Sequence, residues 1–242
     1  MEISLIQLNI EKNKHLERIL LFLSKQIPDV VCLQELRESD ISVITKLLGG
    51  YYFFIPRHLN VENSISIAEG IGIFSKFPIK KSNVEYYRGG EENLFIFDRA
   101  SPETKRKTQN YPIIICDIEK EGILFRIATT HFTWTPDGES DDFQRQDLKK
   151  MLEILNNYGD LVLCGDFNAP RGGEIFGIIA KKFTDNVPPK YTTSIDGKFH
   201  RAGYLERMVD GIFSTCNYKV SEVEMINGLS DHCALVAKII RS

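Results

Sequence analysis

Short apolar runs of the length and pattern of β-strands recur along the whole chain, and only a few helical patterns separate them. Apolar residues that alternate or run continuously favour strands, whereas apolar residues at helical spacing favour helices. Many strands with few helices predict an α+β domain in which two sheets pack face to face with helices outside. Strands are predicted at 3–8, 30–33, 51–56, 70–74, 84–87, 112–118, 124–130, 161–164, 208–214, 219–226 and 233–240, helices near 14–26, 40–48, 142–157 and 174–181, and a polar loop at 60–66.

The chain has 242 residues, which fits one large domain over 1–242. Its 30 basic and 33 acidic residues give a net charge of -3, so we do not expect a uniformly basic surface for non-specific DNA binding. The first residues lack the pattern of a signal peptide, and no apolar run approaches the roughly 18 residues that span a bilayer. We therefore expect a cytoplasmic protein with no membrane attachment and no obligate protein partner.

The chain has five cysteines, none of them in a CxxC pair. Four lie in or beside apolar strand-like runs: Cys32, Cys116, Cys164 and Cys216. Free cysteine is among the most buried residue types, and cytosolic thiols stay reduced. The sequence therefore predicts buried, reduced thiols rather than disulfides or a zinc site.

Polar side chains that can bind a metal or a phosphate recur at the ends of predicted strands. They are Asn9, Glu35, Asp166, Asn168 and Asp231. Strand ends are rigid and can hold oxygen ligands at fixed distances. Mg²⁺ and Mn²⁺ prefer oxygen ligands, and an Mg²⁺ site that keeps its waters needs only one or two carboxylates. Glu35 and Asp231 are the obvious pair for such a site.

Two histidines accompany these residues, since His131 ends a predicted strand and His232 directly follows Asp231. Histidine can donate a hydrogen bond to a phosphate oxygen or transfer a proton near neutral pH. Asp210 lies in an apolar strand, where an unpaired carboxylate is costly. Pairing with His232 would satisfy this carboxylate and hold the imidazole in one tautomer.

Each of these residues alone also has a purely structural explanation. Asn9 could satisfy a turn, Glu35 could be a surface carboxylate, and a lone His131 is more often structural than catalytic. Asp166 and Asn168 could form an Asx turn. Only their joint order along one chain favours a shared site.

Six short blocks occur along the chain in this order: Gln7-Leu8-Asn9-Ile10-Glu11, Leu33-Gln34-Glu35, Thr130-His131-Phe132, Gly165-Asp166-Phe167-Asn168, Val209-Asp210-Gly211-Ile212 and Ser230-Asp231-His232. Together they resemble the signature blocks of the endonuclease/exonuclease/phosphatase family. The resemblance runs from residue 3 to about residue 240, and the stretch Gly70 to Ile79 is similar to a structural strand block of the family. Some members, notably abasic-site endonucleases, have aspartate where this chain has Glu11, so the role of Glu11 is left open.

The resemblance implies a four-layer α/β/β/α sandwich of two mixed sheets flanked by helices, with the site at one edge. It also implies that Glu35 is the principal ligand of Mg²⁺, for which Mn²⁺ could substitute, with Asn9 and Asp231 near the metal. The number of metal ions is not fixed by the sequence.

The same resemblance implies roles for the other site residues in metal-assisted attack of water on a phosphate ester. Asp166 would align or deprotonate the attacking water, and Asn168 would help to hold the water or the phosphate. His131 and His232 would contact the scissile phosphate, and Asp210 would support one of these histidines.

For the substrate, we expect a phosphodiester in nucleic acid, cleaved by an endonuclease, an exonuclease or a DNA-end-processing phosphodiesterase. Because it has a histidine in the Thr130-His131-Phe132 block, the chain resembles the deoxyribonuclease, tyrosyl-DNA phosphodiesterase and sphingomyelinase branches of the family. Abasic-site enzymes tend to carry an aromatic-basic pair that residues 203–208 lack. The alternatives are a phosphatase or phosphodiesterase for small molecules such as inositol phosphates, and a non-catalytic binding module, which the complete set of blocks disfavours.

Basic and aromatic residues outside the blocks are candidates for contacts with this substrate. The charge-rich segment 89–110 could be a hairpin or a substrate-facing loop, although a solvated surface run is the default explanation. Trp134 and Tyr191 could stack on a base, but Trp134 could equally lie at the edge of the core. The candidates for phosphate binding, each with solvated surface charge as the competing explanation, are Arg99, Lys105, Arg106, Lys107, Arg171, His200 and Arg201.

Overall fold

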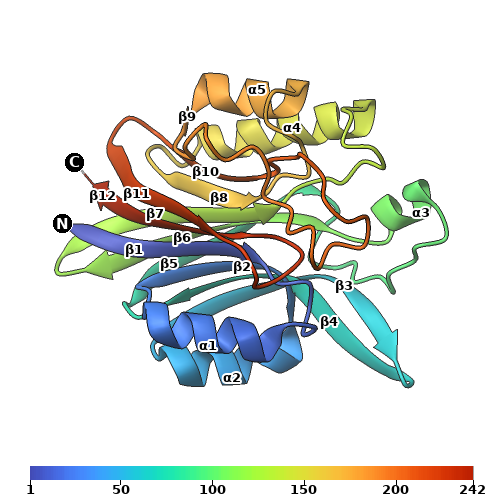
Figure 1. Ribbon diagram of the computed structural model, residues 1–242, viewed down its shortest axis with the longest axis horizontal. Helices are drawn as coiled ribbons and strands as arrows, with labels where there is room; N and C mark the ends of the chain where they lie inside the picture. The colour runs from blue at the N-terminus through green and yellow to red at the C-terminus, as the bar shows by residue number, and fades with distance from the viewer. Residues whose placement is uncertain (242) are drawn as a thin grey trace.

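The computed structural model describes residues 1–241, and its strands form two mixed sheets of six strands each. The first sheet has the order β11-β12-β1-β2-β4-β3 (Figure 1). In it β1 and β2 are parallel, and all other neighbours are antiparallel. Its strands are β1 (Glu2–Asn9), β2 (Val30–Arg37), β3 (Tyr51–Glu62), β4 (Ile65–Ser75), β11 (Tyr218–Ile226) and β12 (Ala234–Arg241).

The second sheet has the order β5-β6-β7-β8-β10-β9. Here β7 and β8 are the parallel pair, so each sheet has one parallel pair near its centre. Its strands are β5 (Ile79–Arg88), β6 (Tyr111–Lys120), β7 (Ile123–His131), β8 (Val162–Asp166), β9 (Thr184–Asp185) and β10 (Asp210–Ser214).

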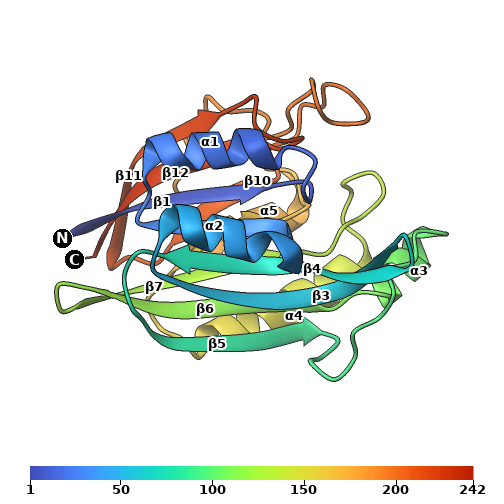
Figure 2. The ribbon, with the colours of Figure 1, turned by 90° about the horizontal axis from the view of Figure 1, so that it is seen from below.

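Helices cover the outer faces of both sheets, two on each side (Figures 1 and 2). The first sheet carries α1 (Leu16–Gln26) and α2 (Ile41–Leu48), and a 3-10 turn, η1 (Glu38–Asp40), leads into α2. The second sheet carries α4 (Asp142–Asn156) and α5 (Glu174–Lys182). A short helix, α3 (Pro102–Lys107), lies beside the sandwich and covers neither sheet.

Three apolar cores hold the four layers together. Successive strand residues point to opposite faces, so Leu5 of β1 packs between the sheets while Ile6 packs toward α1 and α2. The core between the sheets joins residues of both, including Ile73 and Ile127. A third core packs the second sheet against α4 and α5, for example through Leu148. The predicted four-layer sandwich of two mixed sheets flanked by helices is confirmed.

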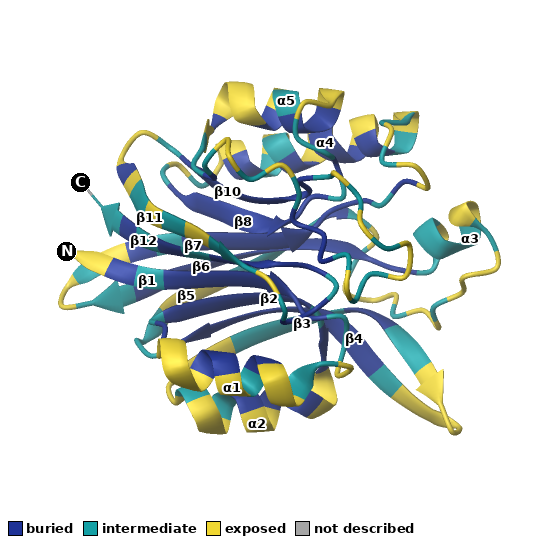
Figure 3. Ribbon diagram, viewed as in Figure 1, coloured by how far each residue is buried: buried dark blue, intermediate teal, exposed yellow. Residues whose placement is uncertain are grey.

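Two local predictions from the sequence are wrong. The predicted loop 60–66 is mostly strand, because β3 continues to Glu62 and β4 begins at Ile65 as one long hairpin. This hairpin extends past the sandwich and ends in an exposed tip (Figure 3). Cys216 is exposed in the turn after β10, whereas the other four cysteines are buried and all five are free. Of the alternatives for the segment 89–110, the hairpin is not formed, and the segment contains α3.

Within residues 1–241, no helix combines the length and the apolar character needed to cross a membrane.

Candidate active site

Strand ends from both sheets bring together side chains that are distant in the sequence. Asn9 ends β1, His131 ends β7 and Asp166 ends β8, with His131 directly opposite Asp166 in the parallel pair. Glu35 lies near the end of β2, and His232 lies just before β12. These five residues line one cavity of about 450 Å³, and we call them the floor of the cavity.

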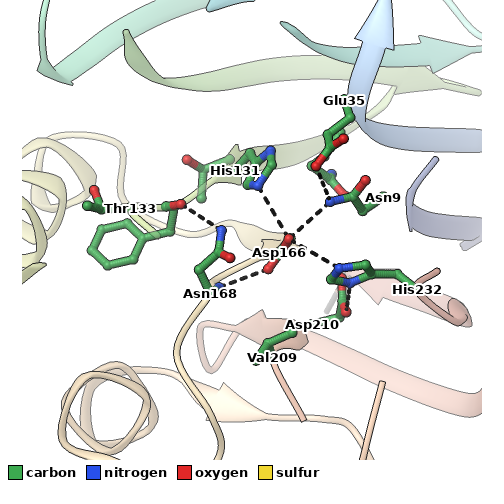
Figure 4. Close-up of polar contacts among 12 residues, drawn as sticks. Asn9, Glu35, His131, Thr133, Asp166, Asn168, Val209, Asp210 and His232 are labelled. Carbon is green, nitrogen blue, oxygen red and sulfur yellow. Dashed lines mark hydrogen bonds and ion pairs between the residues drawn. The ribbon is translucent and has the colours of Figure 1, made fainter. Parts of the chain in front are cut away.

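Asp166 is the centre of the floor, and Asn9, His131 and His232 are all directed at it (Figure 4). Its Oδ2 accepts a hydrogen bond from Asn9 Nδ2 at 3.1 Å. The same oxygen lies 3.4 Å from His131 Nε2 and 3.8 Å from His232 Nε2. Burial raises the pKa of Asp166 to about 6, although the positive charge of His232 opposes this. The carboxylate is therefore ionised at neutral pH but more basic than an ordinary aspartate.

His232 is held by a second buried aspartate, Asp210, which begins β10 directly opposite Asp166. His232 Nδ1 donates to Asp210 Oδ2 at 2.7 Å. Burial alone lowers the pKa of His232, but the negative charges of Asp210 and Asp166 raise it well above its usual value. His232 is therefore an imidazolium whose Nε2–H points at Asp166.

His131 is in the opposite electrostatic situation, because its partner is the cation Arg57 of β3. Both side chains are almost fully buried, at 8% and 4% exposure. Arginine only donates hydrogen bonds, so the 2.8 Å contact makes His131 Nδ1 the acceptor from Arg57 Nη1. Burial lowers the pKa of His131 well below its usual value, and the positive charge of Arg57 adds to this. His131 is therefore neutral and carries its single proton on Nε2.

Glu35 reaches the cavity because β2 has a bulge at this residue. The pairing of β2 with β4 shifts between Gln34 and Leu36, and Glu35 has a left-handed backbone with φ of 53°. β-Bulges often re-aim a side chain beside an active site, and a non-glycine residue at positive φ is uncommon. Glu35 Oε1 accepts a hydrogen bond from Asn9 Nδ2 at 3.3 Å.

Three carboxylates line the cavity and influence one another electrostatically: Glu11, Glu35 and Asp231. Burial raises the pKa of Asp231 to about 7; the charge of His232 opposes the rise, and the charges of Glu35 and Glu11 add to it. Glu11 also pairs with Lys14 and with His15, the latter at 3.3 Å. The excess of negative charge in this corner is the electrostatic environment that a bound cation would neutralise.

Asn168 lies next to the floor, where it holds a local turn and also lines the cavity. Its backbone N–H donates to Asp166 Oδ1 at 2.8 Å, which forms the Asx turn considered from the sequence. Its φ is 48°, a conformation that asparagine tolerates better than most residues. The side-chain Nδ2 donates to the carbonyl of Phe132 at 2.9 Å, and the residue also lines the cavity.

Buried amides connect the floor from beneath, a role that the sequence did not indicate. Gln7 Nε2 donates to Asp210 Oδ1 at 3.0 Å and to Gln34 Oε1 at 2.8 Å. Gln34 Nε2 in turn donates to Thr129 Oγ1 at 3.1 Å in the other sheet. This chain of hydrogen bonds fixes the two sheets relative to each other directly below the site.

A polar wall between the floor and α3 was also missed from the sequence. Glu69 of β4 accepts from Asn60 at 2.7 Å and lies 3.4 Å from His58 and 3.6 Å from Lys12. The ring of His58 stacks on Phe97 at 4.2 Å. The only signal in the sequence was a run of polar residues after Pro56, which resembles an ordinary loop.

The structure divides the candidate substrate contacts into two groups. Five of them line the cavity: Arg99, Lys105, Trp134, His200 and Arg201. Four lie elsewhere: Tyr191 packs against the core between the sheets, and Arg106, Lys107 and Arg171 pair with Asp141, Glu103 and Asp185.

Solved structures with this fold cover nearly the whole chain. The endonuclease/exonuclease/phosphatase from Bacteroides vulgatus has a TM-score of 0.73 at 17% identity, with full coverage of both chains. The catalytic domain of human Nocturnin, with a bound sulfate anion, has a TM-score of 0.72 at 21% identity and covers 100% of this chain and 94% of its own. A mannosyl-6-phosphatase from Bacteroides thetaiotaomicron has a TM-score of 0.71 at 12% identity, with 98% and 99% coverage.

The family model of the Endonuclease/Exonuclease/phosphatase family matches residues 6–232, and the chain belongs to this family. Members of this family are hydrolases that act on phosphate esters and generally depend on a divalent metal. No curated protein sequence matches the chain significantly.

Proposed function

We propose that this protein is a Mg²⁺-dependent phosphodiesterase that hydrolyses nucleic acid by attack of water on phosphorus. The observation that carries the proposal is the arrangement around Asp166, a buried carboxylate between a neutral His131 and a protonated His232. A base for water and two donors for a phosphate thus converge on one point.

In the proposed reaction, Asp166 orients the attacking water and accepts its proton as the new oxygen–phosphorus bond forms. The bond between phosphorus and the leaving ester oxygen breaks, and this oxygen takes up a proton from solvent. A base is most effective when its pKa lies near the working pH, and the value of about 6 for Asp166 satisfies this condition. His131 and His232 donate from Nε2 to phosphate oxygens, where negative charge increases in the transition state. The neutral donor and the cationic donor then stabilise this charge together. Asn168 helps to hold the water or the phosphate beside Asp166.

The carboxylate corner fits a hard divalent cation. Glu35 and Asp231 would hold it, and Asn9 Oδ1 has a lone pair free because its other one accepts from the backbone N–H of Glu11 at 3.1 Å. Glu11 lines the same corner. A bound Mg²⁺, or Mn²⁺ in its place, supplies Lewis-acid polarisation of a phosphate oxygen.

A second possible metal group consists of Asp166, Asp210 and His232, whose ligand atoms lie within 4.8 Å of one another. Both oxygens of Asp210 already accept hydrogen bonds, from His232 Nδ1 and from Gln7 Nε2. An imidazolium cannot ligate a metal until it loses a proton. We therefore assign this group to proton handling rather than to the cation.

A small phosphate ester is the second candidate substrate. It is favoured by the cavity of about 450 Å³, which is the size of a small-molecule site, and by the fold shared with a mannosyl-6-phosphatase. Nucleic acid is favoured by the basic side chains and by Trp134 at the cavity mouth, since bases stack on such rings.

The test is a panel of single- and double-stranded DNA, abasic duplex, 5′-tyrosyl oligonucleotide, RNA and inositol phosphates. Each is incubated with Mg²⁺, with Mn²⁺ or with chelator, and with wild type or the Glu35→Ala variant. Metal-dependent cleavage that the variant loses supports the proposal, and the preferred substrate decides between the two classes. Absence of all cleavage by folded, metal-binding protein would contradict it.

A further inference from the structure

Three cations line the cavity above the floor, and their side chains have neither a carboxylate nor a hydrogen-bond partner among residues 1–241. They are Arg99, Lys105 and Arg201, and we call them the cationic rim. The rim comes from two loops that are far apart in the sequence, one between β5 and β6 and one between β9 and β10. Three unpaired cations at one cavity mouth are costly to keep together, because like charges repel.

The other basic residues nearby already have partners. Arg57 has no carboxylate beside it, but its guanidinium is bound to His131 and to the carbonyl of Asn110. Lys12 lies 3.6 Å from Glu69, and Lys14 pairs with Glu11. Lys107 pairs with Glu103 at 2.6 Å, although it is only two residues from Lys105 on α3. The absence of carboxylates at the rim is therefore a local property of the rim and not of the basic residues in general.

Aromatic rings, rather than acids, hold two of the rim cations in place. The ammonium of Lys105 lies 3.5 Å from the ring centroid of Trp134, and the guanidinium of Arg99 lies 5.0 Å from that of Phe97. Both rings also line the cavity. A cation–π contact fixes the position of a cation but leaves its charge available to an anion.

The short helix α3 is anchored so that Lys105 faces the cavity. Ser101 caps the helix in a reciprocal capping box with Thr104. The next residue after Lys105, Arg106, pairs with Asp141 and lies 4.8 Å from the ring of Phe143 at the start of α4. Lys105 therefore faces the cavity, whereas Arg106 on the same helix attaches α3 to the start of α4.

The rim cations also affect one another electrostatically. Burial lowers the pKa of Lys105 to about 8, with Glu35 opposing the shift and Arg201, Arg99 and Arg57 adding to it. Lys105 is therefore still charged at pH 7, and a bound anion would relieve the repulsion between the rim cations. Burial lowers the pKa of His200, the other basic residue at this mouth, so it adds no positive charge at neutral pH.

We infer that the cationic rim binds a second phosphate of the substrate, separate from the phosphate that is cleaved on the floor. The inference rests on the proposed phosphoesterase function, since it assumes that the floor holds the scissile group. It narrows the substrate class to molecules with at least two phosphates, either a polynucleotide with a neighbouring phosphate or a small bisphosphate. A substrate with one phosphate would leave the rim without a partner.

The direct test is binding, which does not require turnover. Affinities of thymidine 3′,5′-bisphosphate and of the two thymidine monophosphates are measured by calorimetry with Ca²⁺ in place of Mg²⁺. Hydrogen bonds to charged groups predict roughly 10- to 100-fold tighter binding of the bisphosphate. Lys105→Gln and Arg201→Gln should each remove most of this advantage, and Lys107→Gln should leave it unchanged.

Equal affinity of wild type for the bisphosphate and the monophosphates would overturn the inference. So would an equal loss in Lys105→Gln and Lys107→Gln, because that result would reflect general charge rather than a defined site. These outcomes are independent of catalysis, so a protein with no activity on any substrate would contradict the proposed function without deciding the binding result.

Turnover then distinguishes the two sources of the second phosphate. The dinucleotides TpT and pTpT differ only in a terminal phosphate, and the bisphosphate offers a monoester. Preferred cleavage of the pTpT diester identifies a polynucleotide, and release of phosphate from the bisphosphate alone identifies a small substrate. In both cases Lys105→Gln should raise KM for the phosphate-rich substrate, whereas Lys107→Gln should leave both KM and kcat close to wild type.

Discussion

The floor and the rim of the cavity are built on different principles. The floor residues stand on strand ends, and hydrogen bonds within and beneath the sheets connect them. The rim residues stand on two loops and are positioned by aromatic rings and by one six-residue helix. A floor fixed by sheet register can keep its chemistry constant, while loops above it can change to fit another substrate. Changes in the floor should therefore affect turnover, and changes in the rim should affect affinity.

The largest effect is expected from removing a reactive group of the floor. Asp166→Asn keeps the shape but removes the proposed base, and His232→Ala removes the proposed cationic donor. One such group typically contributes about 10²- to 10⁴-fold, so kcat should fall by that factor in each variant. Steady-state kinetics on the best substrate of the panel would measure this loss.

The matched control for these two variants is Lys105→Gln on the rim. It should retain kcat, so the two regions separate in one data set. Circular dichroism should show native folding of all three proteins. Near-normal kcat for Asp166→Asn or His232→Ala would remove that residue from the proposed mechanism.

The next largest effect concerns stability, and it compares two glycines. Gly165 has φ of 150°, and an added Cβ would lie 2.1 Å from the carbonyl oxygen of Thr130 on β7. The β7–β8 pair cannot relax without moving His131 and Asp166, so Gly165→Ala should cost roughly 3 kcal/mol in the free energy of unfolding.

Gly203 is the control in the loop that carries Arg201. Its φ is 70°, but an added Cβ meets nothing within 4 Å. Gly203→Ala should therefore cost only about 1 kcal/mol, the price of the backbone conformation. Urea denaturation of both variants measures the difference, and equal losses would show that the floor is no more rigid than the rim.

The same contrast explains what could be predicted from the sequence. The floor was predictable because each of its residues follows or precedes an apolar run, and strand ends converge wherever sheets stack. Arg57 was missed because its partner His131 lies on a distant strand, and nothing local distinguishes a buried arginine from a surface one. The hairpin of β3 and β4 was missed for a similar reason, since its polar residues are satisfied by Glu69 across the hairpin.

The rim was predicted only as a set of candidates. Lys105, Arg106 and Lys107 are equivalent in the sequence, and only the fold directs the first to Trp134 and the second to Asp141. Cys216 shows the same limit, because it lies beside apolar strand-like runs and was expected to be buried, whereas it is exposed. Contacts between segments that are distant in the sequence decided each case.

A smaller effect is expected from Arg57→Met, which removes the donor to His131 Nδ1. A buried hydrogen bond to a charged group contributes about 1.5–3 kcal/mol, so kcat/KM should fall by about 10- to 100-fold. The pKa of His131 should also rise, because a nearby positive charge no longer opposes its protonation. Nitrogen-15 NMR of the imidazole reports both the tautomer and the pKa.

Arg57→Lys is the control for this variant because it keeps the charge and one donor. It should keep the low pKa of His131 and recover part of the activity. A variant that lost activity with no change in the NMR signals of His131 would show that Arg57 acts through folding alone.

The smallest effect is expected in the wall that supports the rim. Burial alone would raise the pKa of Glu69, but His58 and Lys12 lower it to about 2, from a usual value of 4.5. A carboxyl group whose pKa is lower in the folded than in the unfolded protein stabilises the fold at pH values above the unfolded pKa. This stabilisation is lost as the pH falls toward the pKa of the folded state. Wild type should therefore lose about 1–2 kcal/mol through this group between pH 5 and pH 3, and Glu69→Gln should not. Burial lowers the pKa of His58 and Glu69 opposes this shift, so the two side chains titrate as a pair and the difference between the two proteins reports on that pair. Urea denaturation at pH 7, 5 and 3 measures the free energy of unfolding of both proteins, and parallel pH dependences would contradict the assignment.

The same variant should affect substrate binding through the rim. The ring of His58 stacks on Phe97, and Phe97 in turn contacts the guanidinium of Arg99. Glu69→Gln should therefore raise KM at pH 7 while kcat stays constant.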